Sequence, residues 1–304
     1  MDLIVLALLV LVAVALVSCM HAAQAPGRQS RGSAKPRILI IVSSQDRFRL
    51  REDKTYSTGY FLNELVVPVR KLVDQGYEVV FANPAGNAPA MDPHSDSAEY
   101  FAQDRELYKS YREFHDGLTG LQKPRKLADV IREGLDRYAA IFFPGGHAPV
   151  EDLTQDPDVA KVLQHFHQSG KPTAAICHGP LALLSTLPNP RAFLRGLETG
   201  GLQDASKFAA GWPYAGYRLT VFSTAEENYV EKAPLDGKVR FYPDDALRAA
   251  GANVLVAQPW TAHVVRDREL ITGQQPNSDS EFAAELVKAI QESAGHQVAQ
   301  VAAR

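Results

Sequence analysis

Short apolar runs alternate with stretches of helical spacing through most of the chain. Residues 37–43 contain an uninterrupted run of Ile, Leu and Val, which is typical of a strand buried on both faces of a parallel sheet. Over residues 59–75 the apolar positions recur with the period of a helix, and the pattern ends at Gly76. Residues 77–82 are again apolar. This order predicts a β-α-β unit.

The same alternation continues toward the C-terminus. Strands are predicted at 138–143, 172–176, 217–222, 253–256 and 263–265, and helices at 158–168, 178–187 and 280–291. Strands that alternate with helices indicate an α/β fold in which a mainly parallel, flavodoxin-like, doubly wound sheet is sandwiched by helices. We expect this domain to cover residues 36–292 and to be followed by a C-terminal tail at 293–304.

An insertion at about 87–129 interrupts the pattern. It is rich in Pro, Asp, Ser and aromatic residues and contains a helical stretch at 103–114. We interpret it as a small cap beside the sheet. A surface excursion and a role in shaping the substrate site are equally compatible with the sequence, because long insertions in α/β folds are often functional but not always.

The N-terminus reads as a targeting segment. Every residue from Leu3 to Val17 is Leu, Ile, Val or Ala, which suits the apolar region of a signal peptide, although the preceding residues carry no Lys or Arg. The run ends at Cys19 in a pattern that resembles the lipobox of bacterial lipoproteins. We therefore expect a signal peptide at 1–19, lipid attachment at Cys19, a flexible tether at 20–35 and a domain exported to the periplasm or cell surface. An uncleaved membrane anchor is the alternative.

The charge balance and the cysteine content narrow the possible partners. The formal net charge is −3 and no long run of Lys or Arg occurs, so we expect no nucleic-acid partner. The two cysteines, Cys19 and Cys177, lie in very different contexts, which argues against a disulfide framework. The membrane is expected to be contacted through the N-terminal segment alone.

Cys177 is the strongest candidate for chemistry. It follows the predicted strand at 172–176 directly and precedes the helix at 178–187, so it lies at the carboxyl end of a strand, where open α/β sheets bind ligands. The positive end of the next helix favours a thiolate, and the adjacent His178 can move protons. The alternative is that Cys177 is a small buried apolar residue. The sequence thus predicts a thiolate with a proton shuttle.

Four segments carry a family resemblance at this point. The stretch Ala-Ala-Ile-Cys177-His178-Gly-Pro resembles the nucleophile turn of the ThiJ/PfpI superfamily. The segments at 58–68, 143–147 and 270–276 resemble the family's first helix, glycine turn and late ITGQNP motif, in the same order. The insertion and the Cys-His pair resemble the glyoxalase III and heat-shock-chaperone-like group within it.

The resemblance implies a role for several residues. Glu64 would approach the cysteine from the first helix, and Gly145, Gly146 and the His178 backbone would face a developing oxyanion. An acidic residue after a later strand would hold the histidine. The segment at 220–227 offers Glu226 and Glu227, and we choose Glu226. Two departures affect the motifs: Ala148 and Pro149 follow the glycine turn, and Gln275 replaces the usual Asn.

We expect no cofactor and no metal. Histidines are present, but no pair has the i, i+4 spacing with a glutamate that marks a helical zinc site.

The resemblance implies a glutathione-independent glyoxalase III, with a small 2-oxoaldehyde such as methylglyoxal as substrate. A homodimer is the default assembly because closed two-fold symmetry is the commonest among oligomers. A stress chaperone or protein deglycase that acts on misfolded or glycated proteins is the alternative. A peptidase or an amidotransferase-like protein fits less well, since the late histidine at 263 is followed by two valines rather than by the acid of a His-x-Glu arrangement.

Overall fold

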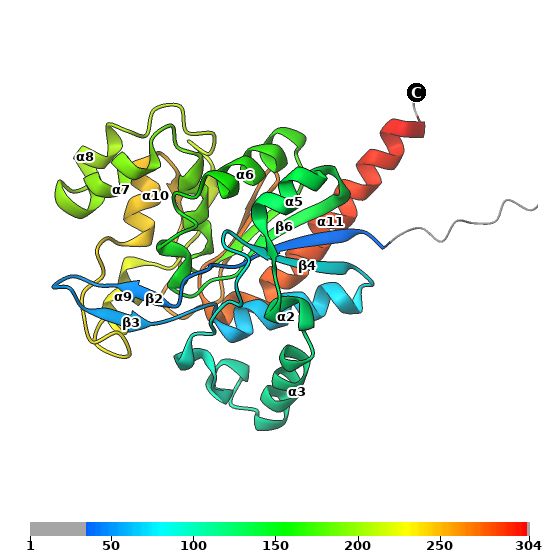
Figure 1. The fold of residues 1–304 in the computed structure, drawn as a ribbon, viewed down its shortest axis with the longest axis horizontal. Coiled ribbons are helices and arrows are strands. Elements are labelled where there is room, and N and C mark those ends of the chain that lie inside the picture. Colours follow the sequence, from blue (N-terminus) through cyan, green and yellow to red (C-terminus); the bar gives the residue numbers. More distant parts are fainter. Residues whose placement is uncertain (1–34, 303–304) are drawn as a thin grey trace, which may run out of the picture. The chain divides into compact units, whose positions relative to one another are not determined.

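The computed structural model describes residues 35–302. In this part of the chain a seven-stranded sheet has the order β10-β11-β7-β6-β1-β4-β5 (Figure 1). Only β10 runs antiparallel to its neighbour here. The strands are β1 (Arg37–Ile41), β4 (Glu78–Asn83), β5 (Arg125–Lys126), β6 (Tyr138–Phe143), β7 (Thr173–Ile176), β10 (Val264–Asp267) and β11 (Leu270–Gly273). The parallel strands follow a flavodoxin-like order, as the alternating pattern predicts.

Helices cover both faces of the sheet, because its central strands are apolar on both sides. Within β1, Ile38 and Ile40 join the core beneath α2 (Leu62–Asp74) and α11 (Asp279–Ala302), which pack against each other. Leu39 and Ile41 join the core of the opposite face. That face and its surroundings hold α5 (Leu127–Glu133), α6 (Pro157–Ser169), α7 (Pro190–Thr199), α8 (Leu202–Ser206), α9 (Thr224–Val230) and α10 (Pro243–Ala250).

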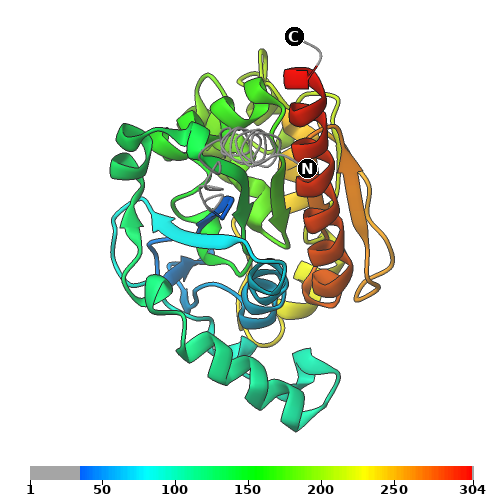
Figure 2. The ribbon, with the colours of Figure 1, turned by 90° about the vertical axis from the view of Figure 1, so that its right-hand side faces the viewer.

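The insertion forms the expected cap. It contains two 3-10 turns (Pro93–Ser95 and Ala98–Phe101), α3 (Arg105–Asp116) and α4 (Thr119–Gln122). Figure 2 shows α3 beyond α2, away from the sheet. Arg70 of α2 holds it there, because its guanidinium lies 5.1 Å from the Tyr111 ring centroid and donates to Ser110 Oγ at 2.8 Å. The insertion also adds β5 to the edge of the sheet, which the sequence pattern did not indicate.

Several elements differ from the sequence prediction. The segments expected as strands at 217–222 and 253–256 shorten to β8 (Arg218–Leu219) and β9 (Asn253–Val254), which pair with each other outside the central sheet. The helix expected at 178–187 is a 3-10 helix, Gly179–Thr186. A hairpin of β2 (Arg47–Arg49) and β3 (Thr55–Ser57) was not predicted. Helix α11 continues to Ala302, through most of the range expected to be a tail.

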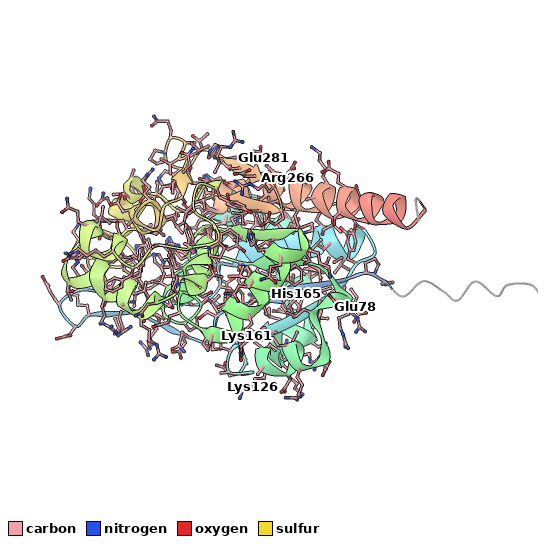
Figure 3. All side chains as sticks on the ribbon, turned by 90° about the horizontal axis from the view of Figure 1, so that it is seen from above. Glu78, Lys126, Lys161, His165, Arg266 and Glu281 are labelled. Carbon is pink, nitrogen blue, oxygen red and sulfur yellow. The ribbon has the colours of Figure 1, made fainter. Side chains whose placement is uncertain are left out.

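The outer side of α6 shows the division between polar surface and core. Lys161, labelled in Figure 3, is exposed and His165 is half-buried, while Val162, Leu163 and Phe166 on the same helix are fully buried. No helix between residues 35 and 302 is both long and apolar enough to cross a membrane. The apolar run at 3–17 and the proposed lipid site at Cys19 lie outside the described residues.

Candidate active site

Cys177 lies on the tight turn between β7 and the 3-10 helix at 179–186, as predicted. Its φ of +61° places it in the left-handed region, which residues with a side chain rarely adopt. Both of its peptide groups are held by later segments: its N–H donates to Gly273 O at 2.9 Å, and its carbonyl accepts from Phe222 N–H at 3.0 Å. Such backbone strain persists where the surroundings fix it, often at functional sites.

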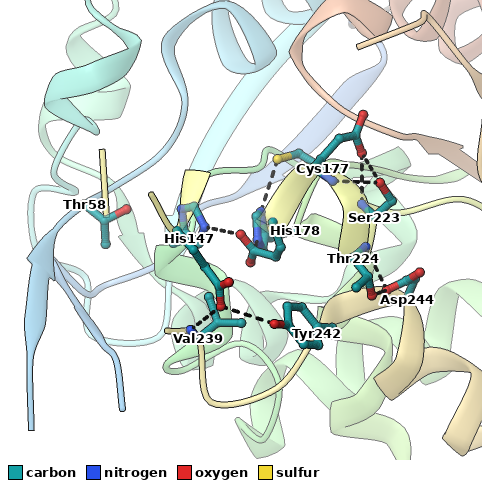
Figure 4. A network of polar contacts seen from close by, with 12 residues as sticks. Thr58, His147, Cys177, His178, Ser223, Thr224, Val239, Tyr242 and Asp244 are labelled. Carbon is teal, nitrogen blue, oxygen red and sulfur yellow. Dashed lines mark hydrogen bonds and ion pairs between the residues drawn. The ribbon is translucent and has the colours of Figure 1, made fainter. Parts of the chain in front are cut away.

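A line of hydrogen bonds runs from the sulphur to a carboxylate (Figure 4). Cys177 Sγ lies 3.2 Å from His178 Nδ1, and His178 Nε2 lies 2.9 Å from Glu227 Oε1. Burial and the neighbouring His147 lower the pKa of His178 to about 4, so its ring is neutral at pH 7. Because a carboxylate can only accept, Nε2 carries the ring proton. Nδ1 therefore has a free lone pair for the thiol proton.

Glu227 also binds a second histidine. His147 Nε2 lies 3.2 Å from Glu227 Oε2, and the two imidazole rings lie 4.2 Å apart between centroids. Although burial opposes ionisation, the two histidines lower the pKa of Glu227 to about 2. Burial likewise disfavours charge on His147, but Glu227 raises the pKa of this ring above its ordinary value. The carboxylate thus stays charged and fixes both rings.

Glu226, which the sequence analysis chose as the acid, does not contact His178. It is the N3 residue of α9 and forms a capping box with Ser223: its Oε2 accepts from the Ser223 N–H at 2.9 Å, and the Ser223 hydroxyl accepts from its own N–H. Glu227, one position further round the helix, faces the histidine instead. The signal for this was in the sequence, because Ser-x-x-Glu is the pattern of a capping box.

Glu64 reaches the nucleophile from the first turn of α2, as expected. Its side chain is fully buried, and neither carboxyl oxygen has a hydrogen bond of ordinary geometry in the described structure. Burial raises the pKa of Glu64 well above the ordinary value, while its closeness to Cys177 opposes that shift in part. The shift favours the neutral, protonated form of Glu64 beside the sulphur.

The glycine turn lets the backbone approach the sulphur. A Cβ at Gly145 would lie 2.4 Å from Cys177 Cβ and 2.3 Å from Glu64 Oε2, so no side chain fits there. Gly146 has a φ of +90°. The N–H groups of Gly146 and His178 act on the Cys177 sulphur and lower its pKa. They are the candidate donors to an oxyanion, whereas Gly145 supplies space and accepts from Phe61 N–H at 3.2 Å.

The resting state of Cys177 differs from the expected thiolate. Burial and the nearby Glu64 raise its pKa well above the ordinary value, although the N–H groups of Gly146 and His178 oppose this. The cysteine is 4% exposed, and the helix after it is a short 3-10 helix rather than a long α-helix. The raised pKa favours the thiol over the thiolate in the resting site.

A cavity of about 420 Å³ opens in front of the sulphur. Its walls come from the cap, the glycine turn, the nucleophile turn, α9 and the loop before β10. Because Asp92, His94, Glu99 and Tyr100 of the insertion line it, the cap shapes this site rather than being a mere surface excursion. Its other prominent lining residues are His147, Cys177, His178, Phe222, Tyr229 and Trp260.

The cluster of His147, His178 and Glu227 also has the composition of a metal site. One donor atom from each residue lies within 4.8 Å of the others. Both carboxylate oxygens already accept from the imidazole Nε2 atoms, which are the same atoms that would bind an ion. We therefore interpret the cluster as a proton-transfer site.

The described residues form a flavodoxin-like sheet with a candidate cysteine site at the end of β7, and the comparisons agree with this fold. Residues 57–188 match the DJ-1/PfpI family. The protein/nucleic acid deglycase HchA of Staphylococcus aureus (strain bovine RF122 / ET3-1) is 28% identical over 263 residues, which cover 83% of this chain and 81% of the relative.

Two crystal structures show the same fold. The Rapid Encystment Protein of 24 kDa from Francisella tularensis has a TM-score of 0.61 and 23% identity, covering 84% of this chain and 99% of its own. Glyoxalase III from Candida albicans has a TM-score of 0.58 and 22% identity, covering 84% and 97%. Together these findings support the ThiJ/PfpI superfamily, which the motifs resemble, and the chain has the flavodoxin-like α/β fold of that group.

Proposed function

We propose that the protein is a glutathione-independent glyoxalase that converts a small 2-oxoaldehyde to a 2-hydroxy acid. The observation that carries this proposal is the continuous line from Cys177 Sγ through His178 to Glu227 at the edge of a cavity. Such a line can take a proton from sulphur and return it to carbon. The name of the C. albicans structure supports the same activity.

The first step is addition of Cys177 to the aldehyde carbon. His178 Nδ1 accepts the thiol proton as the C–S bond forms, and the carbonyl electron pair moves to oxygen. The N–H groups of Gly146 and His178, which lower the pKa of Cys177, are the donors that would stabilise this oxyanion. The oxyanion then takes the proton back from His178, which gives a neutral thiohemiacetal.

The second step moves hydrogen between neighbouring carbons. His178 removes the proton from the former aldehyde carbon, the hydroxyl proton passes to the neighbouring oxygen, and the resulting enediolate is protonated at the former ketone carbon. This oxidises one carbon and reduces the other without a cofactor, and leaves a 2-hydroxyacyl thioester on Cys177. Water then cleaves the thioester to release the acid and the thiol. Glu227 keeps His178 in the productive tautomer throughout.

Lactate formation from methylglyoxal without glutathione tests the proposal. We expect turnover by the purified protein, none by Cys177→Ala, and full activity in Phe208→Ala, which alters a 40%-exposed aromatic residue outside the cavity. Absence of lactate formation by a wild-type protein that is shown to be correctly folded would exclude this function.

Protein deglycation is the second candidate. The S. aureus relative is named a deglycase, and Tyr229 at the cavity is 62% exposed, so a side chain carried on another protein could enter there. Release of 2-hydroxy acid from N-acetylarginine treated with methylglyoxal, at a higher kcat/KM than from free methylglyoxal, would favour deglycation. Suppression of aggregation that survives Cys177→Ala would instead indicate a chaperone.

We propose further that the protein is exported and anchored through Cys19. The apolar run at 3–17 and the cysteine after it motivate this interpretation. Metabolic labelling with a fatty acid in a bacterial host should mark the wild type and not Cys19→Ser. Equal labelling of both would exclude lipid attachment at this residue.

A further inference from the structure

The proposed reaction does not use the strained backbone of Trp260. This residue lines the cavity from the irregular segment between β9 and β10, and its φ is +65°. Bulky residues adopt this conformation rarely, since their side chain crowds the backbone. A conformation of this kind costs free energy, and it points to a functional contact where the surroundings hold it in place.

Both peptide groups that flank Trp260 are held. Its N–H donates to Glu226 Oε1 at 3.0 Å, and its carbonyl accepts from Asn277 Nδ2 at 2.8 Å. The next carbonyl, of Thr261, accepts from Gln275 Nε2 at 2.9 Å. Gln275 is the residue that departs from the family motif, and here it helps to hold the tryptophan loop.

Glu226 connects this loop to the proton-transfer line. It is fully buried, accepts from Ser223 Oγ at 2.7 Å, and receives Gln274 Nε2 on both oxygens at 3.1 Å. Its neighbour in the chain, Glu227, holds the histidines. One turn of α9 therefore fixes both the reacting group and the wall of the cavity.

The side chain of Trp260 completes an aromatic surface. It lies edge-on to Phe222, with centroids 5.9 Å apart, and to Tyr229 at 5.4 Å. Phe222 stacks on His178 at 4.8 Å with an interplanar angle of 29°. The aromatic surface thus begins at the catalytic imidazole and extends outward to Trp260. A planar apolar group attached to the reacting carbonyl would lie against this surface.

The size of the cavity agrees with a substituent larger than a methyl group. At about 420 Å³ it falls within the range, roughly 300–1,000 Å³, of sites that hold drug-sized ligands. Methylglyoxal would leave most of this volume and the aromatic surface to water.

We propose that Trp260 is a specificity-determining residue that selects 2-oxoaldehydes with an aromatic or bulky apolar substituent on the ketone carbon. Glu226 and Asn277 are its positioning residues. The inference rests on the proposed function and adds the substrate class to it.

The kcat/KM values for phenylglyoxal and methylglyoxal test the selection. We expect phenylglyoxal to be preferred about tenfold in the wild type, a range that apolar pockets reach. Trp260→Ala should lower this ratio about tenfold, mainly through KM, and Trp260→Phe should restore most of it. Trp212→Phe, which changes a buried tryptophan outside the cavity, should leave the ratio unchanged. An unchanged ratio in Trp260→Ala would overturn the proposal.

Fluorescence tests the positioning role. The chain has two tryptophans, so Trp212→Phe leaves Trp260 as the sole emitter. In this background Glu226→Gln replaces a carboxylate that accepts from Trp260 N–H and Gln274 Nε2 with an amide that can also donate. The loop that carries Trp260 should loosen, and we expect red-shifted emission and stronger quenching by acrylamide. Asn277→Ala, which leaves the α9 cap intact, should do the same to a smaller degree. An unchanged spectrum in both variants would exclude the positioning role.

Alkylation separates failure of this inference from failure of the proposed function. We would measure the rates at which N-phenylmaleimide and N-methylmaleimide alkylate Cys177, on the Cys177 peptide by mass spectrometry. Each rate is divided by the rate of the same reagent with glutathione. The comparison shows whether the aromatic surface at Trp260 favours a phenyl group, and it requires no turnover. Suppose that no 2-oxoaldehyde is turned over, that the phenyl reagent is preferred, and that Trp260→Ala abolishes this preference. The glyoxalase function is then excluded, while the selection of aromatic groups by Trp260 is supported. Absence of preference in the wild type would overturn the inference itself.

Discussion

Two buried carboxyl groups near Cys177, Glu64 at the start of α2 and Glu227 at the start of α9, have pKa values shifted in opposite directions. Both side chains are essentially without exposure. Burial raises the pKa of Glu64, whose oxygens lack hydrogen-bond partners in the described residues, while two histidines bring the pKa of Glu227 to about 2 despite its burial. The hydrogen-bonding and charged partners of a buried glutamate, rather than its burial alone, decide whether the protonated or the ionised form is favoured.

This difference divides the work at Cys177. A neutral Glu64 can share a proton with the sulphur, whereas an anionic Glu227 cannot give one up and instead orients the imidazole. Substitutions that convert one carboxyl into a neutral amide should therefore have unequal effects, large at Glu227 and smaller at Glu64.

The largest effect is expected for Glu227→Gln. The amide keeps the shape but allows the wrong imidazole tautomer, so we expect kcat for 2-oxoaldehyde turnover to fall about 10³-fold. Glu231→Gln is the matched control, since Glu231 is another buried glutamate of the α9 region but lies outside the cavity and accepts from Val239 N–H at 2.9 Å. Retention of wild-type kcat in Glu227→Gln would contradict the proposed proton line.

The stability of the same variant should depend on pH. A carboxyl whose pKa falls from 4.5 to about 2 on folding stabilises the folded state above pH 4.5, and this contribution is lost as the pH falls toward 2. We expect Glu227→Gln to lower the free energy of unfolding by on the order of 3 kcal/mol at pH 7. Denaturant titrations should show this difference shrinking below pH 4.5. A difference that stays constant down to pH 2 would mean that Glu227 is not ionised in the folded protein.

Glu64→Gln should have a smaller effect, of a different kind. Without the acid proton, kcat is expected to fall roughly 10- to 100-fold. Because Glu64 raises the pKa of Cys177, its removal should also shift the pH at which iodoacetamide labels this cysteine to lower values. A labelling profile that matches the wild type would show that Glu64 does not interact with the sulphur.

The smallest effect is expected for His147→Asn. His147 lowers the pKa of His178, so its loss should raise that pKa above about 4. His178 acts as a base in its neutral form, and the acid limb of the kcat/KM profile should therefore move to higher pH, with about a tenfold loss at the optimum. An acid limb at the same pH as in the wild type would show that His147 does not affect the pKa of His178.

The layers of the fold were predictable from periodicity alone. The apolar run at residues 37–43 and the strand at 138–143 need no partner information, because both faces of each strand are buried. Two short strand pairings were not predicted, for the opposite reason. β2 with β3, and β8 with β9, carry too few residues for a period, and only contacts with distant segments define them.

The site residues that lie in local sequence motifs were predictable. Cys177, His178 and Glu64 follow from the nucleophile turn and the first helix. His147 was noted only as part of the glycine turn, because its bond to Glu227 joins residues that are distant in sequence. The expectation of a thiolate did not take into account the burial that raises the pKa of Cys177, because this burial depends on packing from the whole domain.

The backbone of Cys177 is hydrogen-bonded to Phe222 and Gly273, which lie far downstream. During synthesis the nucleophile therefore leaves the ribosome long before the segments that hold its strained conformation and bury it. Before β11 pairs with β7, the cavity around Cys177 and the backbone hydrogen bond from its N–H to Gly273 cannot form. The site is complete only with the last strands, so turnover itself would report that the whole domain has folded.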